Sequence, residues 1–98
     1  MTTLHYEAST HRIRLEGVCR NDDGLALRDA LEAFGPMAGG HLIVDLTAVT
    51  DIDPAVAAEV VQAVRSASHD GKQLTLLRKD GTAVDEALSA AESAFDLP

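Results

Sequence analysis

Apolar and polar residues alternate along the first part of the chain. Leu4 and Tyr6 fall on one side of an extended stretch, and Ile13 and Leu15 alternate with charged residues after a polar break. A period of two is typical of strands that bury one face, so this pattern predicts a β-hairpin that ends at Gly17. We expect the polar face of the hairpin to stay open to water or to a partner.

Three later stretches have the spacing of amphipathic helices. Their apolar residues recur three or four positions apart, and charged residues lie mostly on the opposite side. A glycine follows the first two stretches, as is common after the end of a helix. The predicted helices run from Asp22 or Asp23 to Phe34, from near Pro54 to about Asp70, and from Val84 to Phe95.

Two short apolar runs, "HLIVDL" at 41–46 and "QLTLL" at 73–77, predict buried strands. A helix connects them, and such a crossover is right-handed and makes the two strands parallel. The predicted order is therefore β-β-α-β-α-β-α. We expect an α/β fold with a mixed four-stranded sheet, with helices packed mainly on one face, in a single domain over residues 1–98.

Composition excludes several classes of function. Sixteen acidic against eight basic residues give a net charge of −8, which disfavours binding to nucleic acid or to an anionic membrane surface. No apolar run approaches the roughly 20 residues that cross a bilayer, and no secretion signal is visible. The single cysteine, Cys19, is typical of a reducing compartment. We therefore expect a cytoplasmic protein without direct membrane insertion.

The junction "TDIDPAVAAEV" at 50–60 predicts the start of the second helix. Asp53 is a favourable N-cap, because its carboxylate accepts hydrogen bonds from free N–H groups of the first turn and contributes about 1 kcal/mol over alanine. Its charge also faces the positive end of the helix dipole. Pro54 suits the first helical position, where no N–H is needed. We expect this junction to be a rigid helix end.

The segment from His41 to Leu77 resembles the core of the STAS domain, the family of bacterial anti-sigma factor antagonists. The matching residues are the strand that ends in Asp45-Leu46, the pair Ile52-Asp53 and the turn at Gly71. The opening hairpin and the first helix fit the order of the family as well, so the resemblance spans nearly the whole chain. It implies a STAS-like fold.

The chain departs from the family pattern at the helix start. Pro54 and Ala55 stand where the family has two serines, of which the second is the usual phosphoacceptor, and Val56 replaces a glycine. Alanine has no oxygen that could accept a phosphoryl group. We therefore expect a non-enzymatic protein-binding module with a fixed recognition surface that lacks the usual phosphorylation switch. The residues expected to contact the partner are Asp51, Asp53, Pro54, Ala55, Ala57 and Ala58.

Thr50 is the best replacement phosphoacceptor because it lies beside the junction. The alternative is a loop hydroxyl bonded to nearby backbone, which is the commoner role. Asp45, Asp51 and Asp53 raise the question of Mg²⁺. The alternative is that Asp53 caps the helix, Asp45 orders the loop and Asp51 is solvated. We favour that alternative and predict no metal, no cofactor and no catalytic residue.

Three kinds of partner fit the resemblance. The first is an anti-sigma factor or kinase, which the domain would sequester. The second is the ATPase of a membrane transporter, to which a STAS-like accessory subunit would dock. The third is a nucleotide, although Arg78 and Lys79 are the only basic pair near the junction and no phosphate-binding glycine loop is present.

Overall fold

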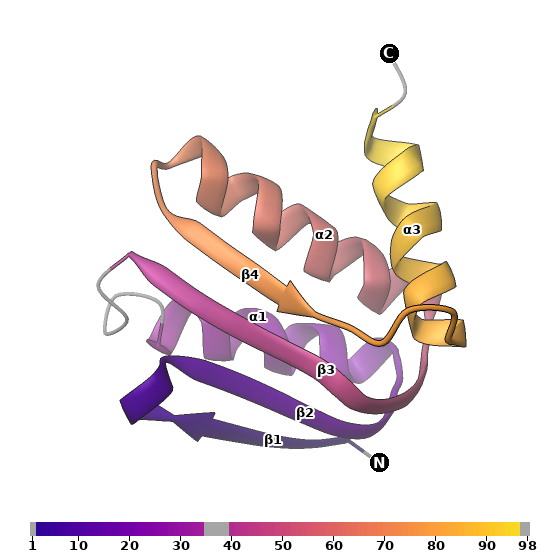
Figure 1. Ribbon diagram of the computed structural model, residues 1–98, viewed down its shortest axis with the longest axis horizontal. Coiled ribbons are helices and arrows are strands. Elements are labelled where there is room, and N and C mark those ends of the chain that lie inside the picture. The colour runs from indigo at the N-terminus through magenta and orange to yellow at the C-terminus, as the bar shows by residue number, and fades with distance from the viewer. Residues whose placement is uncertain (1, 35–39, 97–98) are drawn as a thin grey trace.

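The computed structural model describes residues 2–34 and 40–96 of the chain. Eight elements follow one another in the predicted order, with a short 3₁₀ turn added inside the hairpin (Figure 1). The helices α1, α2 and α3 alternate with the later strands. The elements are β1 (Thr2–Glu7), η1 (Ala8–Thr10), β2 (Arg12–Cys19), α1 (Asn21–Phe34), β3 (His41–Ile52), α2 (Pro54–His69), β4 (Gln73–Leu77) and α3 (Ala83–Asp96).

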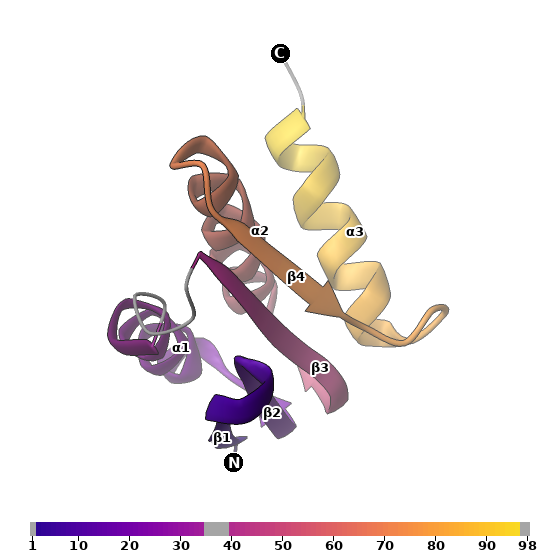
Figure 2. The same cartoon turned by 60° about the vertical axis from the view of Figure 1, so that its left-hand side comes forward.

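The four strands form one mixed sheet in the order β1-β2-β3-β4. β1 pairs with β2 in antiparallel fashion, whereas β2, β3 and β4 are parallel to one another. α1 and α2 lie on the same side of this sheet, behind it in Figure 1 and to its left in Figure 2, and α3 lies beside α2 and contacts β3. The predicted fold class is confirmed.

The core lies between the helices and one face of the sheet. Alternate residues of β2 are buried, and Ile13, which is opposite Val44 in the register, has no exposed surface. The helices bury the stripes that their spacing predicts, with Leu27 in α1, Val60 in α2 and Leu88 in α3 each at most 2% exposed. The glycine that follows the first predicted helix, Gly35, lies outside what the structure describes, as do the side chains of Phe34 and Phe95.

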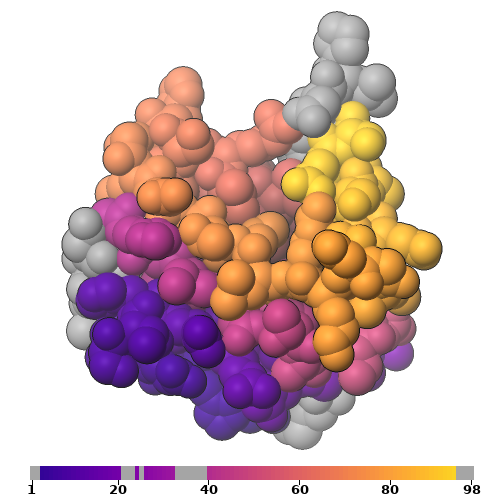
Figure 3. Space-filling view, viewed as in Figure 1, coloured from indigo at the N-terminus to yellow at the C-terminus, as the bar shows by residue number. Residues whose placement is uncertain are grey.

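None of the described helices lies on the opposite face of the sheet (Figure 1). Arg12 and Arg14 of β2 point to this face together with His41 and Ile43 of β3, because their neighbours in each strand point into the core. Figure 3 shows this surface, formed by residues of all four strands. The expectation of a polar, uncovered face on the hairpin agrees with this arrangement.

Two predicted strand ends were wrong. The sequence predicts that the hairpin ends at Gly17, but β2 continues to Cys19. The sequence predicts a strand at 41–46 and a loop at 47–51, but β3 continues to Ile52. The extension pairs with β2, where Ala48 lies opposite Glu16 and Ile52 lies opposite Cys19, and the register shifts twice along it. These irregularities explain why the apolar alternation breaks at this point while the strand itself goes on.

Candidate functional site

The junction between β3 and α2 has the backbone geometry that the sequence predicts. Asp53 is extended (φ −68°, ψ 144°) and Pro54 opens the helix. The carbonyl oxygen of Asp53 accepts hydrogen bonds from the N–H groups of Val56 and Ala57, both at 3.0 Å. The N–H of Asp53 donates to the Cys19 carbonyl at 2.9 Å. The helix start is therefore tied to the end of β2.

The carboxylate of Asp53 does not cap the helix, contrary to the sequence prediction. It makes no hydrogen bond to the first turn and lies instead 3.3 Å from a guanidinium nitrogen of Arg20. The same nitrogen lies 3.7 Å from the carboxylate of Asp51. The physical reason is that Arg20, which follows β2, is brought beside the end of β3 by the parallel pairing. One positive charge thus faces two negative charges at this corner.

Most residues predicted to contact a partner are accessible. Pro54 and Ala55 are exposed, Asp51 keeps 54% of its side-chain surface, and Ala58 is half-buried. Ala57 is fully buried in the core, contrary to its predicted contact with a partner. A partner could reach Ala57 only if α2 separated from the sheet. We call the accessible set Asp51, Asp53, Pro54, Ala55 and Ala58 the helix-start surface.

The Thr50 hydroxyl is bonded to nearby backbone, which is the alternative to a phosphoacceptor role. Thr50 is exposed near the end of β3, and its hydroxyl lies 3.3 Å from the carbonyl oxygen of Gly17, to which it donates a hydrogen bond. This bond crosses from β3 to β2 and supports the irregular part of their pairing. Thr50 is exposed, so a kinase could reach its hydroxyl, and phosphorylation of Thr50 stays a prediction.

Asp45 lies away from the helix-start surface on the uncovered face of the sheet. Its carboxylate is buried and accepts hydrogen bonds from the Thr47 N–H at 2.9 Å and the Thr47 hydroxyl at 2.6 Å. A nitrogen of Arg12 lies 3.6 Å away. Burial opposes ionisation, but the bonds from Thr47 and the charges of Arg12 and Arg14 outweigh it and lower the pKa of Asp45.

The three aspartates considered for Mg²⁺ therefore belong to two separate ion-paired groups. Asp45 is bonded by Thr47 and faces Arg12, whereas Asp51 and Asp53 share Arg20. In residues 2–34 and 40–96, no three His, Cys, Asp or Glu side chains gather as metal ligands would. The arrangement of Asp45 indicates a structural role within β3.

Asp45→Asn is expected to lower stability in a pH-dependent way. Asparagine keeps an oxygen for Thr47 but loses the charge that faces Arg12, which costs about 1–2 kcal/mol at pH 7. Because the folded pKa of Asp45 is lowered, its stabilisation is present above the ordinary carboxyl pKa of about 4 and disappears as the pH falls further. Urea unfolding from pH 7 to pH 3 measures this, and a difference that stays constant over that range would contradict the assignment.

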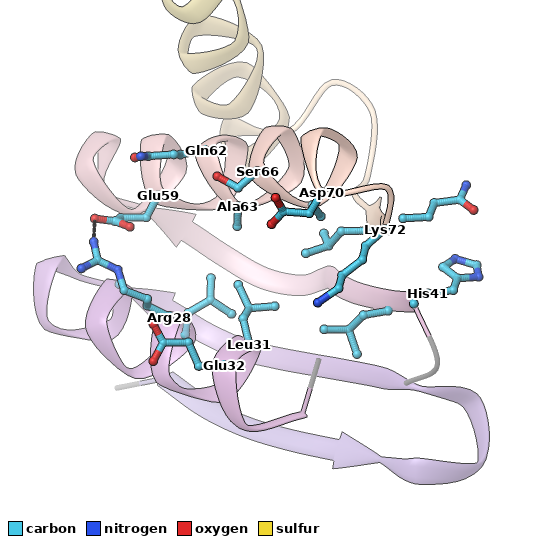
Figure 4. A pocket seen from close by; sticks show the side chains of 17 residues that line it. Arg28, Leu31, Glu32, His41, Glu59, Gln62, Ala63, Ser66, Asp70 and Lys72 are labelled. Carbon is cyan, nitrogen blue, oxygen red and sulfur yellow. Dashed lines mark hydrogen bonds and ion pairs between the residues drawn. The ribbon is translucent and has the colours of Figure 1, made fainter. Parts of the chain in front are cut away.

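A hollow that sequence reasoning missed lies between α1 and α2, above the start of β3 and β4 (Figure 4). It measures about 650 Å³, and its floor is apolar, with Leu27, Leu31 and Leu74 among its lining. At one end Arg28 of α1 binds Glu59 of α2, and this bond lowers the pKa of Glu59. Only tertiary packing brings the two helices together here, so no local pattern could have revealed the hollow.

Arg78, one of the two basic residues considered for nucleotide binding, is already ion-paired within the protein. Arg78 lies 2.9 Å from the carboxylate of Asp85 and 2.8 Å from that of Glu92, both in α3. Two carboxylates around one guanidinium leave that group a poor site for a phosphate, which would be repelled by the same charges. The contacts of Arg78 thus join the end of β4 to α3.

The fold and the helix-start surface define an α/β module with a mixed sheet and a helix that begins directly after its third strand. Comparison with protein families identifies this class, since the model described as "Mlab, STAS domain" matches residues 3–93. The chain belongs to the STAS domain family. Members of the family in general act as regulatory or binding modules. A comparison with curated proteins finds no match.

Solved structures support the fold. "Crystal Structure Analysis of Mglu" is similar with a TM-score of 0.62 and 22% identity, over 82% of this chain and 20% of that chain. "Crystal Structure Analysis of Mglu in its native form" gives a TM-score of 0.55 and 20% identity, over 79% and 23% of the two chains. This chain thus spans about a fifth of the length of those proteins. At such identities the likeness concerns the fold only.

No described helix combines the length and the apolar character that crossing a bilayer requires.

Proposed function

We propose that this STAS domain is a non-enzymatic, cytoplasmic binding module that recognises a regulatory protein through the helix-start surface. The observation that carries the proposal is the exposure of small residues at a rigid helix start. Pro54 and Ala55 are exposed and Ala58 is half-buried, while the backbone beneath them is fixed by bonds to Asp53. A partner could approach this backbone closely without displacing large side chains.

Two carboxylates and one guanidinium frame this surface and give it polarity. Asp51 and Asp53 share Arg20, so the corner keeps a net charge of about −1 at neutral pH. Polar and charged groups around a small apolar centre are typical of transient interfaces. A partner that presents a basic side chain beside an apolar one would complement this corner.

The recognition surface of the proposed module is permanently active. Ala55 occupies the place of the family phosphoacceptor and has no hydroxyl, so a kinase could not add charge there. In a switchable relative, a phosphate would bring up to about two negative charges next to Asp51 and Asp53. The partner would be an anti-sigma factor or related kinase, or the ATPase of a transporter, as the resemblance implies.

Ala55→Asp tests the proposal by imitating the missing charge. An acidic residue in the first turn favours the helix by about 0.3–1 kcal/mol, so the fold should be at least as stable as before. Partner capture from the native cell should nevertheless fall about tenfold, because the carboxylate would replace a small apolar side chain at the centre of the interface and would be buried there without a partner charge. The measurement is affinity purification with quantitative mass spectrometry of the proteins retained.

Ala55→Asn is the matched control, since asparagine has nearly the same size as aspartate but no charge. It should retain most of the capture that wild type shows. Equal retention of the partner by wild type and Ala55→Asp would contradict the proposed surface. The identity of the captured protein separates the two kinds of partner, a sigma-regulating kinase from a transporter ATPase.

A further inference from the structure

The hollow between α1 and α2 is bounded at one end by contact between the two helices. Gly24 of α1 lies against α2 there, because a Cβ atom at this position would be 3.6 Å from Cγ of Glu59 and 3.8 Å from a methyl group of Val56. Arg28 bonds to Glu59 one turn later and joins the helices at the same end (Figure 4). A partner helix could not pass this end, whereas the tail of a smaller molecule could stop there.

The inner surface of the hollow is apolar. Leu27 and Leu42 are each at most 5% exposed, and Leu31, Leu74 and Ala63 line the space while only half-buried. The volume of about 650 Å³ lies within the range of about 300–1,000 Å³ that is typical of small-molecule sites. Covering half-buried leucines with methylene groups removes apolar surface from water and is favourable. The hollow thus suits an apolar chain.

Lys72 brings a positive charge into this apolar surrounding. It lies in the turn between α2 and β4, and its N–H donates to the Ala67 carbonyl at 2.8 Å, which fixes its backbone at the rim. Its side chain points into the hollow, on the side away from the Arg28–Glu59 bond (Figure 4). Within the described part of the chain, no carboxylate forms an ion pair with the Lys72 ammonium. This cation is therefore available to an anionic group of a ligand.

The other charges at the rim belong to Arg28, Glu32, Glu59 and Asp70. Glu59 is bonded to Arg28, and Glu32 also attracts Arg28 electrostatically. Asp70 is the group that opposes an anion. Its carboxylate lies at the level of α2, whereas the ammonium of Lys72 reaches down toward α1 (Figure 4). The arrangement favours an anionic head group inside the hollow.

We propose that the hollow between α1 and α2 binds an amphipathic carboxylate of the medium-chain fatty acid class, with its head group on Lys72 and its alkyl chain on the leucines. The carboxylate would accept a charge-assisted hydrogen bond from the ammonium. The chain would run from Lys72 toward the Arg28–Glu59 bond and displace water from Leu31 and Ala63. One charged end and one blind apolar end thus match a molecule with one carboxylate and one straight chain.

The test is a titration of the full chain with decanoate below its micellar concentration, followed by the amide chemical shifts of the isotope-labelled protein in nuclear magnetic resonance. Decanoate should bind and shift the amides of Leu31, Ala63 and Leu74, while that of Ala55 stays unchanged. Octanoate should bind about tenfold more weakly, because it buries two methylene groups fewer. Decylamine, which has an alkyl chain of the same kind and the opposite charge, should bind more weakly than decanoate.

Lys72→Glu reverses the charge that the proposal assigns to the head group. It should bind decanoate more than about tenfold more weakly than wild type and should prefer decylamine. Lys79→Glu is the matched control, because the other lysine of the chain is exposed after β4 and does not line the hollow. It changes the net charge of the protein by the same amount and should bind decanoate like wild type. Circular dichroism shows that both variants stay folded.

The absence of decanoate binding, a preference of wild type for decylamine, or equal affinity of Lys72→Glu and wild type for decanoate would overturn the proposal. So would shifts confined to residues outside the hollow. The inference is independent of the proposed function, since the hollow lies farther along α2 than the helix-start surface and is measured with variants of its own. A protein that captures its partner but does not bind decanoate would remove only the ligand site.

Discussion

Leu88→Ala is expected to lower the free energy of unfolding by about 3 kcal/mol, within the range of about 2–5 kcal/mol for buried leucines. Leu88 has no exposed surface and lies in α3, which packs on α2 and β3. Truncation would leave a cavity between these elements. Only a short turn joins α3 to β4, so α3 can move little to fill that cavity. Urea unfolding monitored by circular dichroism gives the change, and the melting temperature should fall by about 4–8 °C per kcal/mol.

Ser89→Ala is the control for this substitution. Ser89 is the next residue of α3 and is exposed, so its replacement should change stability by less than about 0.5 kcal/mol. A loss below about 1 kcal/mol for Leu88→Ala would show that α3 contributes little to the core. It would then be a dispensable addition to the sheet and its first two helices.

The regular parts of the fold could be predicted because each depends on a local period. Alternation placed Ile13 and Leu15 in the core, and helical spacing placed Val60 and Leu88 there. These positions follow from which side of a strand or helix a residue occupies. The parallel pairing of β3 and β4 followed from the helix between them.

The extension of β3 could not be predicted in the same way. Its pairing with β2 shifts register, so exposed and buried residues do not alternate strictly between Thr47 and Ile52. A local pattern shows neither a register shift nor the partner strand that permits it. The β-branched Thr47, Val49 and Thr50 were a signal for strand, but the polar residues among them favoured a loop.

The sequence predicted the backbone conformation of the candidate site but not its ion pairs. Asp53 and Pro54 indicate a helix start from neighbouring residues alone, and the structure places one there. The ion pairs of Arg20 with Asp51 and Asp53 join residues 31 and 33 positions apart, so only the tertiary pairing of β2 with β3 creates them. The burial of Ala57 could have been found, since it shares the helical spacing of Val60 and Val61.

Ala58→Arg is expected to reduce partner capture to the background level, a loss of more than about 100-fold or 2.7 kcal/mol. Ala58 is half-buried in α2, one turn after the helix start, and a partner that approaches closely there needs a small side chain. Arginine would hold the partner away from Pro54 and Ala55. It would also place an unpaired guanidinium in the interface. The measurement is the affinity purification used for the Ala55 variants.

Ala90→Arg is the matched control, because the same substitution is made at an exposed alanine of a different helix, α3. It should capture the partner like wild type. Ala55→Arg is a second probe, since Ala55 is exposed and the longer side chain does not disturb the core. If both Ala58→Arg and Ala55→Arg keep their fold and still capture the partner, recognition must use another face, and the uncovered side of the sheet with Arg12 and Arg14 becomes the next surface to alter.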